Sequence, residues 1–114
     1  MSSNTIVDLS ITADLEQDLL EEIFESYVRG GNASLQRVND GLTNNDLSEI
    51  SFGAHKLKGS SIGVGAKSIA KLAALIEQQA EEGNNELLTQ VKELNQQFEE
   101  IKSFLKEKSF IKEA

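Results

Sequence analysis

The chain contains no proline, and its apolar residues recur at spacings of three and four over long stretches. Proline interrupts helices, whereas a spacing of three to four places apolar side chains along one face of a helix. Clusters of glycine and asparagine, which favour turns, separate these stretches near residues 43–45, 63–65 and 83–85. Four apolar faces joined by short turns predict an all-α protein, an antiparallel up-down-up-down four-helix bundle.

The first apolar stripe is the longest, and two glycines interrupt it. Thr12 is a candidate N-cap, and from Leu15 apolar residues repeat about every four positions as far as Leu42. The register continues across Gly30 and Gly31. The segment is therefore either one long helix with a weak point or two helices joined almost in line. We expect no site residue in it.

Local signals mark the ends of the other helices. Asp46 followed by Glu49 fits a wider form of the capping box, which starts the second helix. Gly63 and Gly65 are expected to end that helix, because glycine accepts the left-handed conformation of a C-cap. The third helix is expected over residues 66–82. The last helix carries the core-facing series Leu87, Val91, Leu94, Phe98, Ile101 and Leu105.

Length and composition exclude several classes of protein. The chain has 114 residues, enough for one domain over residues 1–114. Within it, 1–11 is expected to be a partly ordered leader whose Ile6, Leu9 and Ile11 pack on the domain, and 108–114 a tail that folds back or stays exposed. With no cysteine and one histidine, disulfides are impossible and a stable transition-metal site is not expected. No apolar run reaches the roughly 20 residues of a membrane span, and the N-terminus lacks a secretory pattern, so we expect a cytoplasmic protein.

Charge is unevenly distributed along the chain. The net charge is -8, which argues against nucleic acid as a partner. Residues 50–76 nevertheless contain no acidic residue and carry +4, so the rest of the chain carries -12. The lysines of this stretch are Lys56, Lys58, Lys67 and Lys71. A basic patch on an acidic body favours recognition of an anionic surface, although solvated lysines can produce the same pattern. The predicted docking patch consists of Lys67, Lys71, Phe52 and Ile62.

His55, the only histidine, occupies a position in the second helix that suits a phosphoryl carrier. Neutral imidazole is a nucleophile near pH 7, and residues three and four positions further along a helix share its face. Here these are Lys58, whose charge would balance an anion on the ring, and Gly59, which leaves room for a partner. The position lies beside the core stripe, so we expect a ring that is neither buried nor fully exposed. Phe52 and Ile62 are expected on the same face.

Glu77 of the third helix is the residue expected to face His55. In an antiparallel hairpin that turns near residues 63–65, residues 55 and 77 lie at comparable depths. The Glu77 carboxylate is then placed to accept a hydrogen bond from Nδ1–H, which leaves Nε2 as the nucleophile. The simpler alternative is that His55 is an ordinary surface histidine, Glu77 a surface glutamate and Lys58 a solvated charge.

The region around His55 resembles the signature of histidine-containing phosphotransfer (HPt) domains. The matching residues are His55, Leu57, Lys58, Gly59, Ser60 and Ser61, followed by Gly65 and Ala66. The later run Leu72, Leu75, Ile76 and Glu77 is similar to the helix that follows in that family. The general pattern extends over about residues 12–107, and a free-standing single-domain member is expected, although a domain cut from a larger kinase would look the same.

The resemblance implies a phosphorelay intermediate in two-component signalling. His55 would accept a phosphoryl group on Nε2 from a receiver's phospho-aspartate and pass it to an aspartate of another receiver. Lys58 and Lys56 would stabilise the phosphoryl oxygens, Gly59 would give the receiver access, and Glu77 would orient His55. No cofactor is expected on the chain, and Mg²⁺ is expected on the partner receiver.

Four other functions have to be considered. The glycines of residues 59–68 match neither G-x-x-x-x-G-K-[ST] nor G-x-G-x-x-G, so a nucleotide site is not expected. Without an ATP-binding segment, the chain is expected to carry phosphoryl groups and not to act as a kinase. A docking module that is never phosphorylated, and a dimeric phosphotransferase resembling the sporulation-type relay proteins, both stay open. We expect a monomer of 12.5 kDa. The pattern does not identify the donor kinase, the acceptor regulator or the direction of transfer.

Overall fold

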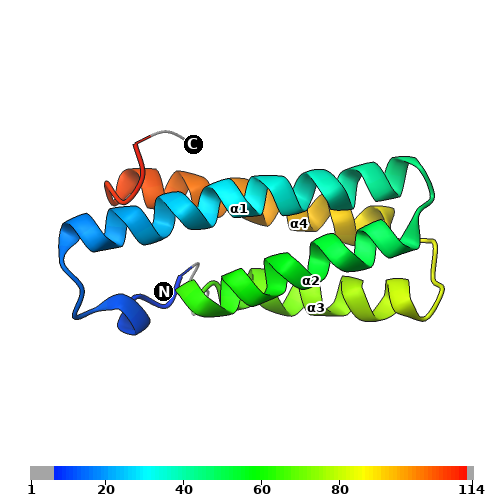
Figure 1. Ribbon diagram of the computed structural model, residues 1–114, viewed down its shortest axis with the longest axis horizontal. Coiled ribbons are helices and arrows are strands. Elements are labelled where there is room, and N and C mark those ends of the chain that lie inside the picture. The colour runs from blue at the N-terminus through cyan, green and yellow to red at the C-terminus, as the bar shows by residue number, and fades with distance from the viewer. Residues whose placement is uncertain (1–6, 113–114) are drawn as a thin grey trace.

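Within residues 7–112, four long helices follow one another in alternating directions (Figure 1). The computed structural model describes residues 7–112. A short 3₁₀ helix, η1 (Leu9–Thr12), precedes α1 (Gln17–Thr43), α2 (Leu47–Val64), α3 (Lys67–Glu81) and α4 (Leu88–Glu107). The predicted all-α, up-down-up-down bundle is confirmed. None of the helices in the described residues combines the length and the apolar character that crossing a membrane requires.

Helix α1 is continuous and begins later than predicted. Its N-cap is Glu16, whereas Thr12, the predicted cap, is the last residue of η1. The helix passes through Gly30 and Gly31 without a break, which decides between the two alternatives for this segment. A Cβ atom on Gly31 would overlap the ring of Phe98 in α4, so the missing side chain allows that ring to lie against the backbone of α1.

The core-facing stripe of α1 is correct in its second half and wrong at its start. Tyr27 and Leu35 are buried as predicted, but Leu19 is 42% exposed and Phe24 is fully buried instead. A repeat of four residues advances about 40° beyond a full turn at each step, because the helix has about 3.6 residues per turn. Followed backwards from Tyr27, the stripe therefore rotates away from the core.

The ends of α2 differ from the prediction in two details. The Asp46 carboxylate accepts a hydrogen bond from the backbone N–H of Glu49 at 3.3 Å, as expected of an N-cap. The reciprocal half of the capping box is not formed, because the Glu49 side chain pairs with Nε of Arg37 at 3.2 Å. Gly63 lies inside the helix, and Gly65 alone is the C-cap, with φ of 82°.

The described part of the leader packs against the bundle. Val7 is only 1% exposed, and the backbone N–H of Asp8 donates to the carbonyl of Gly65 at 2.8 Å. This bond ties the leader to the turn between α2 and α3. Of the three leader residues expected to pack on the domain, Leu9 is partly buried against the core, whereas Ile11 is 50% exposed. Ile6 lies outside the described residues.

The last described residues fold back onto α1. Phe110 stacks on Phe24 with 5.2 Å between ring centroids, and Ile111 is 3% exposed. Residues 108–114 were expected either to fold back or to stay exposed, and the described part, up to residue 112, folds back. These contacts extend the core beyond the end of α4.

Tyr27 offers a test of this core, because it is the only tyrosine and the chain has no tryptophan. Its hydroxyl lies 2.8 Å from that of Ser61, and burial raises the pKa of Tyr27 to about 12. An unfolded chain ionises tyrosine near pH 10. The neutral phenol therefore contributes stability that is complete below about pH 10 and lost as pH rises towards 12.

We expect the tyrosinate absorbance of the folded chain to titrate with a midpoint near 12. The urea midpoint should fall more steeply above about pH 10 for the wild type than for Tyr27→Phe, which has no phenol to ionise. A folded-state midpoint close to that of the urea-unfolded chain would contradict the buried position of Tyr27.

Candidate functional site

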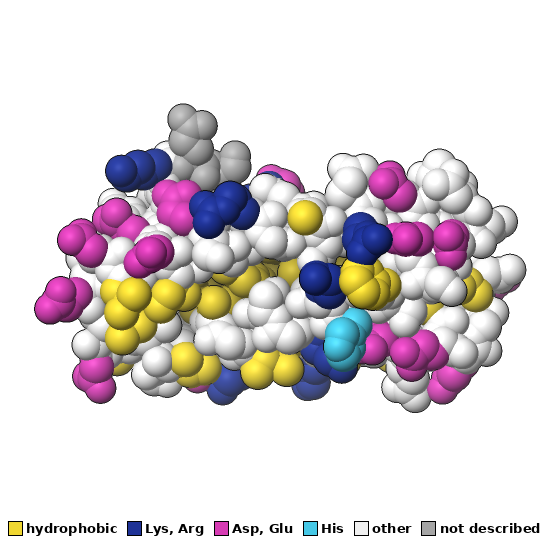
Figure 2. Space-filling model, in the orientation of Figure 1, with side chains coloured by type: hydrophobic (Ala, Val, Ile, Leu, Met, Phe, Trp, Pro, Cys, Tyr) yellow, Lys and Arg dark blue, Asp and Glu magenta, His cyan; other side chains and the backbone are white. Residues whose placement is uncertain are grey.

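His55 lies in the middle of α2 with its ring at the surface (Figure 2). Its side chain is 63% exposed, which agrees with the expected position, neither buried nor fully exposed. The buried face of α2 is formed by Ile50, Ala54 and Leu57, each 2% exposed or less. Each residue turns the helix by about 100°, and this rotation carries His55 past the edge of the contact with the bundle. Figure 2 shows the cyan ring between basic and hydrophobic side chains on one side and acidic side chains on the other.

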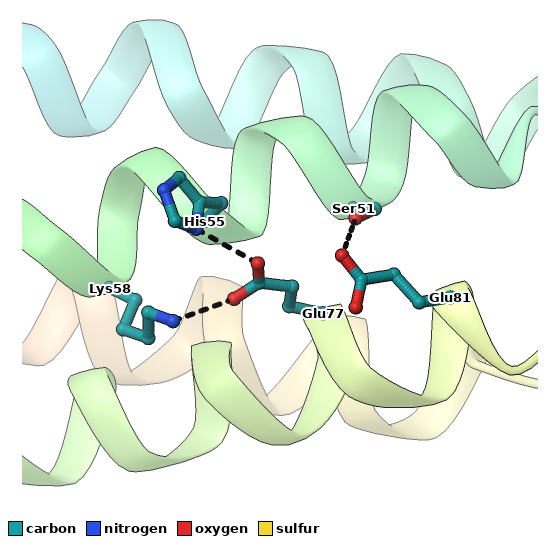
Figure 3. Close-up of polar contacts among 5 residues, drawn as sticks. All are labelled: Ser51, His55, Lys58, Glu77 and Glu81. Carbon is teal, nitrogen blue, oxygen red and sulfur yellow. Dashed lines mark hydrogen bonds and ion pairs between the residues drawn. The ribbon is translucent and has the colours of Figure 1, made fainter.

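Glu77 of α3 links His55 and Lys58 through its two carboxylate oxygens (Figure 3). Oε2 lies 2.8 Å from Nδ1 of His55, and Oε1 lies 2.9 Å from Nζ of Lys58. Burial raises the pKa of the Glu77 carboxyl, but hydrogen bonds from Lys58 and His55 outweigh burial and hold the pKa below its ordinary value. Glu77 is therefore ionised at neutral pH, and because a carboxylate only accepts hydrogen bonds, the contact requires a proton on Nδ1 of His55. When the ring is neutral, this tautomer has its lone pair on Nε2.

A second polar contact joins the same two helices one turn away. The Ser51 hydroxyl donates to Oε2 of Glu81 at 3.2 Å (Figure 3). Ser51 precedes His55 by one turn of α2, and Glu81 follows Glu77 by one turn of α3. In this antiparallel hairpin, residue 51 therefore lies opposite residue 81 and residue 55 opposite residue 77. The expected contact between residues 55 and 77 required this arrangement.

The exposed face of α2 around His55 has an apolar residue at each end. Phe52 is 45% exposed and Ile62 60% exposed, and both lie on the side of the helix that carries His55. Gly59 is exposed between them, and a Cβ atom there would meet no atom within 4 Å. We call Phe52, His55, Gly59 and Ile62 the α2 stripe. Among the described residues, no neighbouring atom therefore requires a glycine at this position.

The four lysines of residues 50–76 have different surroundings in the structure. Nζ of Lys58 is bonded to Glu77, whereas Nζ of Lys56 lies 5.4 Å from the centre of the Phe52 ring. Nζ of Lys67 lies 3.0 Å from Oδ2 of Asp8 in the leader. Lys71 is exposed one turn further along α3. The structure thus gives Lys58 and Lys67 carboxylate partners that the spacing of the sequence did not indicate.

Arg37 is a residue of this region that sequence reasoning missed, because no site residue was expected in the first helix. Its guanidinium carbon lies 4.3 Å from the centre of the Phe52 ring, and its Nε pairs with Glu49. Residues 37 and 52 stand at similar distances from the turn at 43–45. Matching residues across that turn, as was done for 55 and 77, could have found this contact.

The surroundings of His55 offer little to a metal ion. A shallow groove between α2 and α3 is lined by eight residues: Leu47, Ser48, Ser51, Phe52, His55, Glu77, Ala80 and Glu81. Within residues 7–112, no group of three or more histidine, aspartate or glutamate side chains is placed to hold a metal. The arrangement of His55 and Glu77 suits a nucleophilic imidazole with one nitrogen oriented and the other exposed.

The tautomer of His55 can be measured directly. We expect the neutral ring to carry its proton on Nδ1 in the wild type, and to lose this preference in Glu77→Ala, which removes the acceptor. The two ¹⁵N chemical shifts of the single histidine in a long-range ¹H–¹⁵N spectrum report the tautomer. Glu81→Ala is the matched control, since it breaks the neighbouring contact to Ser51. An unchanged tautomer in Glu77→Ala would contradict an orienting role.

Comparison with protein families gives one match. A family model described as Hpt domain matches residues 17–103, which extend from the first residue of α1 into α4. The matched region includes His55, Lys58, Gly59 and Glu77. Comparisons with curated proteins and with solved structures found no match.

Proposed function

The chain belongs to the Hpt domain family, and from this premise we propose that it is a phosphorelay intermediate that carries the phosphoryl group on His55. Domains of this family transfer phosphoryl groups through a histidine in two-component signalling, with receiver domains as partners. The observation that carries the proposal is the contact between Nδ1 of His55 and the Glu77 carboxylate at 2.8 Å. That contact supports Nε2 as the free nucleophile, on a ring that is 63% exposed.

In the proposed reaction, Nε2 of His55 attacks the phosphorus of a receiver's aspartyl phosphate. A P–N bond forms, the P–O bond to the receiver breaks, and the aspartate leaves as a carboxylate. Because Nδ1 keeps its proton, the phosphorylated ring is cationic, and the Glu77 carboxylate is placed to stabilise that charge. Attack on the same phosphorus by a carboxylate of a second receiver reverses these steps, so no other reactant is consumed.

The neighbours of His55 have proposed roles in the same reaction. Lys58, with Lys56, would offset negative charge on the phosphoryl oxygens. Glycine inside a helix costs about 1 kcal/mol relative to alanine, and within residues 7–112 no close contact at Gly59 explains that cost. Space for the approaching receiver is the function that we assign to it. We place the Mg²⁺ that the reaction requires on the receiver, and we propose that this chain carries phosphoryl groups without using ATP itself.

The test is transfer from a phosphorylated receiver domain to the full chain in the presence of Mg²⁺. We expect at most one phosphoryl group per chain, with the lability in acid and stability in alkali of a phosphoramidate. Adding a second, unphosphorylated receiver should remove the label. If several receivers bind the chain but none labels it, the chain is a docking module and the proposal fails. Sedimentation at a mass other than 12.5 kDa would favour the dimeric alternative.

A further inference from the structure

Phe52 is an exposed aromatic side chain that two cations hold in place. It precedes His55 by one turn on α2, and both residues line the groove between α2 and α3. The guanidinium carbon of Arg37, on α1, lies 4.3 Å from the centre of its ring, and Nζ of Lys56 lies 5.4 Å from the same centre. Both distances lie within the range of a cation–π contact. An apolar ring bordered by positive charge therefore lies directly beside the nucleophile.

Arg37 is itself held by an ion pair. Its Nε lies 3.2 Å from Oε1 of Glu49, which stands one turn before Phe52 on α2. The two side chains of this pair are 47% and 39% exposed, and exposed ion pairs contribute little to stability. The main effect of the pair is to restrict where the guanidinium, and with it the Phe52 ring, can lie.

The contacts of Phe52 and Arg37 order these two side chains before any partner binds, as in a preorganised binding surface. Aromatic residues and arginine dominate the energy of many protein interfaces. A side chain that is already held in one position loses less entropy when a partner binds. The chain as a whole carries -8, so the two cations beside Phe52, which border the α2 stripe, are a local feature that attracts an acidic partner.

From this arrangement we infer that Arg37 is a specificity-determining residue for the receiver partner. It holds Phe52 against an apolar patch of the receiver and offers the remaining N–H groups of its guanidinium to a carboxylate at the edge of that patch. The partner is a receiver domain whose phosphorylated aspartate lies beside an apolar surface bordered by acidic residues. This inference rests on the proposed function, because it needs the receiver to dock beside His55.

The test compares the two arginines of the chain, which both lie on α1. Arg37→Gln is expected to raise the dissociation constant for a receiver about tenfold, the size expected for an interface arginine. The maximal rate of phosphoryl transfer at saturating receiver should not change, since Arg37 does not touch the reacting atoms. Arg29→Gln is the matched control. Arg29 is exposed two turns earlier, and within residues 7–112 it forms no ion pair, so its loss should have no measurable effect.

Two further variants show whether Arg37 acts through Phe52. The effect of Arg37→Gln should be smaller in a Phe52→Ala background than in the wild type, because contacting residues are energetically coupled. Arg37→Lys should restore only part of the affinity, since it keeps the charge but not the planar group that covers the ring. Thermal unfolding of each variant confirms that binding is compared between folded chains.

Equal effects of Arg37→Gln and Arg29→Gln, or full additivity with Phe52→Ala, would overturn the inference. If transfer occurs normally and Arg37→Gln binds as the wild type does, only the role of Arg37 is wrong. If receivers bind in an Arg37-dependent manner but no phosphoryl group is transferred, the docking surface stands and the proposed function fails.

Discussion

Replacing His55 with glutamine is expected to abolish labelling by a phosphorylated receiver while leaving the bundle folded. The chain has no other histidine and no cysteine, so no second side chain offers a comparable nucleophile. The ring is 63% exposed, and in the described part of the chain it is hydrogen-bonded to Glu77 alone, so little packing is lost. Glutamine also carries an N–H donor that can bond to the Glu77 carboxylate, which preserves the link between α2 and α3.

The measurement follows label on the wild type and on His55→Gln, together with receiver binding and the thermal midpoint of each chain. We expect no detectable label on the variant, with receiver affinity and thermal midpoint close to those of the wild type. Acid-labile label on His55→Gln would show that another atom accepts the phosphoryl group. Loss of receiver binding in the variant would instead mean that the imidazole is part of the docking contact.

Gly53→Ala is expected to destabilise the bundle, although alanine favours helices. Gly53 is buried where α2 crosses α1, and a Cβ atom there would lie 2.7 Å from the carbonyl oxygen of Ser34 and 2.8 Å from Cγ2 of Val38. The carbonyl belongs to the backbone of α1, so the helices must separate to admit a methyl group. We expect a net loss of about 1–3 kcal/mol in the free energy of unfolding, the usual cost of overpacking a core.

Gly59→Ala provides the matched control for stability, because it makes the same change in the same helix. A Cβ atom on Gly59 meets no atom within 4 Å, so we expect a gain approaching 1 kcal/mol from helix propensity. Gly30→Ala tests the same point in α1, where the space is also open. Urea unfolding measures all three variants. A Gly53→Ala chain as stable as Gly59→Ala would contradict the close approach of α1 and α2.

Much of the candidate site could be predicted because its residues share one hairpin. The turn between α2 and α3, at Gly65 and Ala66, is short, so positions counted from it along the two helices locate opposing residues. His55 lies ten positions before Gly65 and Glu77 eleven positions after Ala66, which places Glu77 beside His55. The same counting applied to the turn at 43–45 would have placed Arg37 beside Phe52. Arg37 was missed because no local pattern in the first helix resembles a site, and the sequence does not show which cations reach across to a neighbouring helix.

The ion pairs of Lys58 and Lys67 could not be predicted from the sequence. Lys67 meets Asp8 because the leader folds back over the turn between α2 and α3, and Lys58 meets Glu77 because of how far α3 is rotated. Long flexible side chains can reach several partners, and the choice among them depends on the positions of other helices. Counting the lysines in residues 50–76 therefore predicted a basic stretch of sequence. It did not predict which of these lysines are paired with carboxylates in the folded chain.

By itself, the sequence determined the four helices, their alternating order and the face of α2 that carries His55 and Gly59. These follow from local periodicity and short turns, which act within a few residues along the chain. Only the tertiary structure decided that the His55 ring is exposed, that Glu77 holds both His55 and Lys58, and that Arg37 covers Phe52. The reason is that the rotation and spacing of each helix are set by close packing against its neighbours, as at Gly53 and Gly31, and this packing involves residues far apart in the sequence.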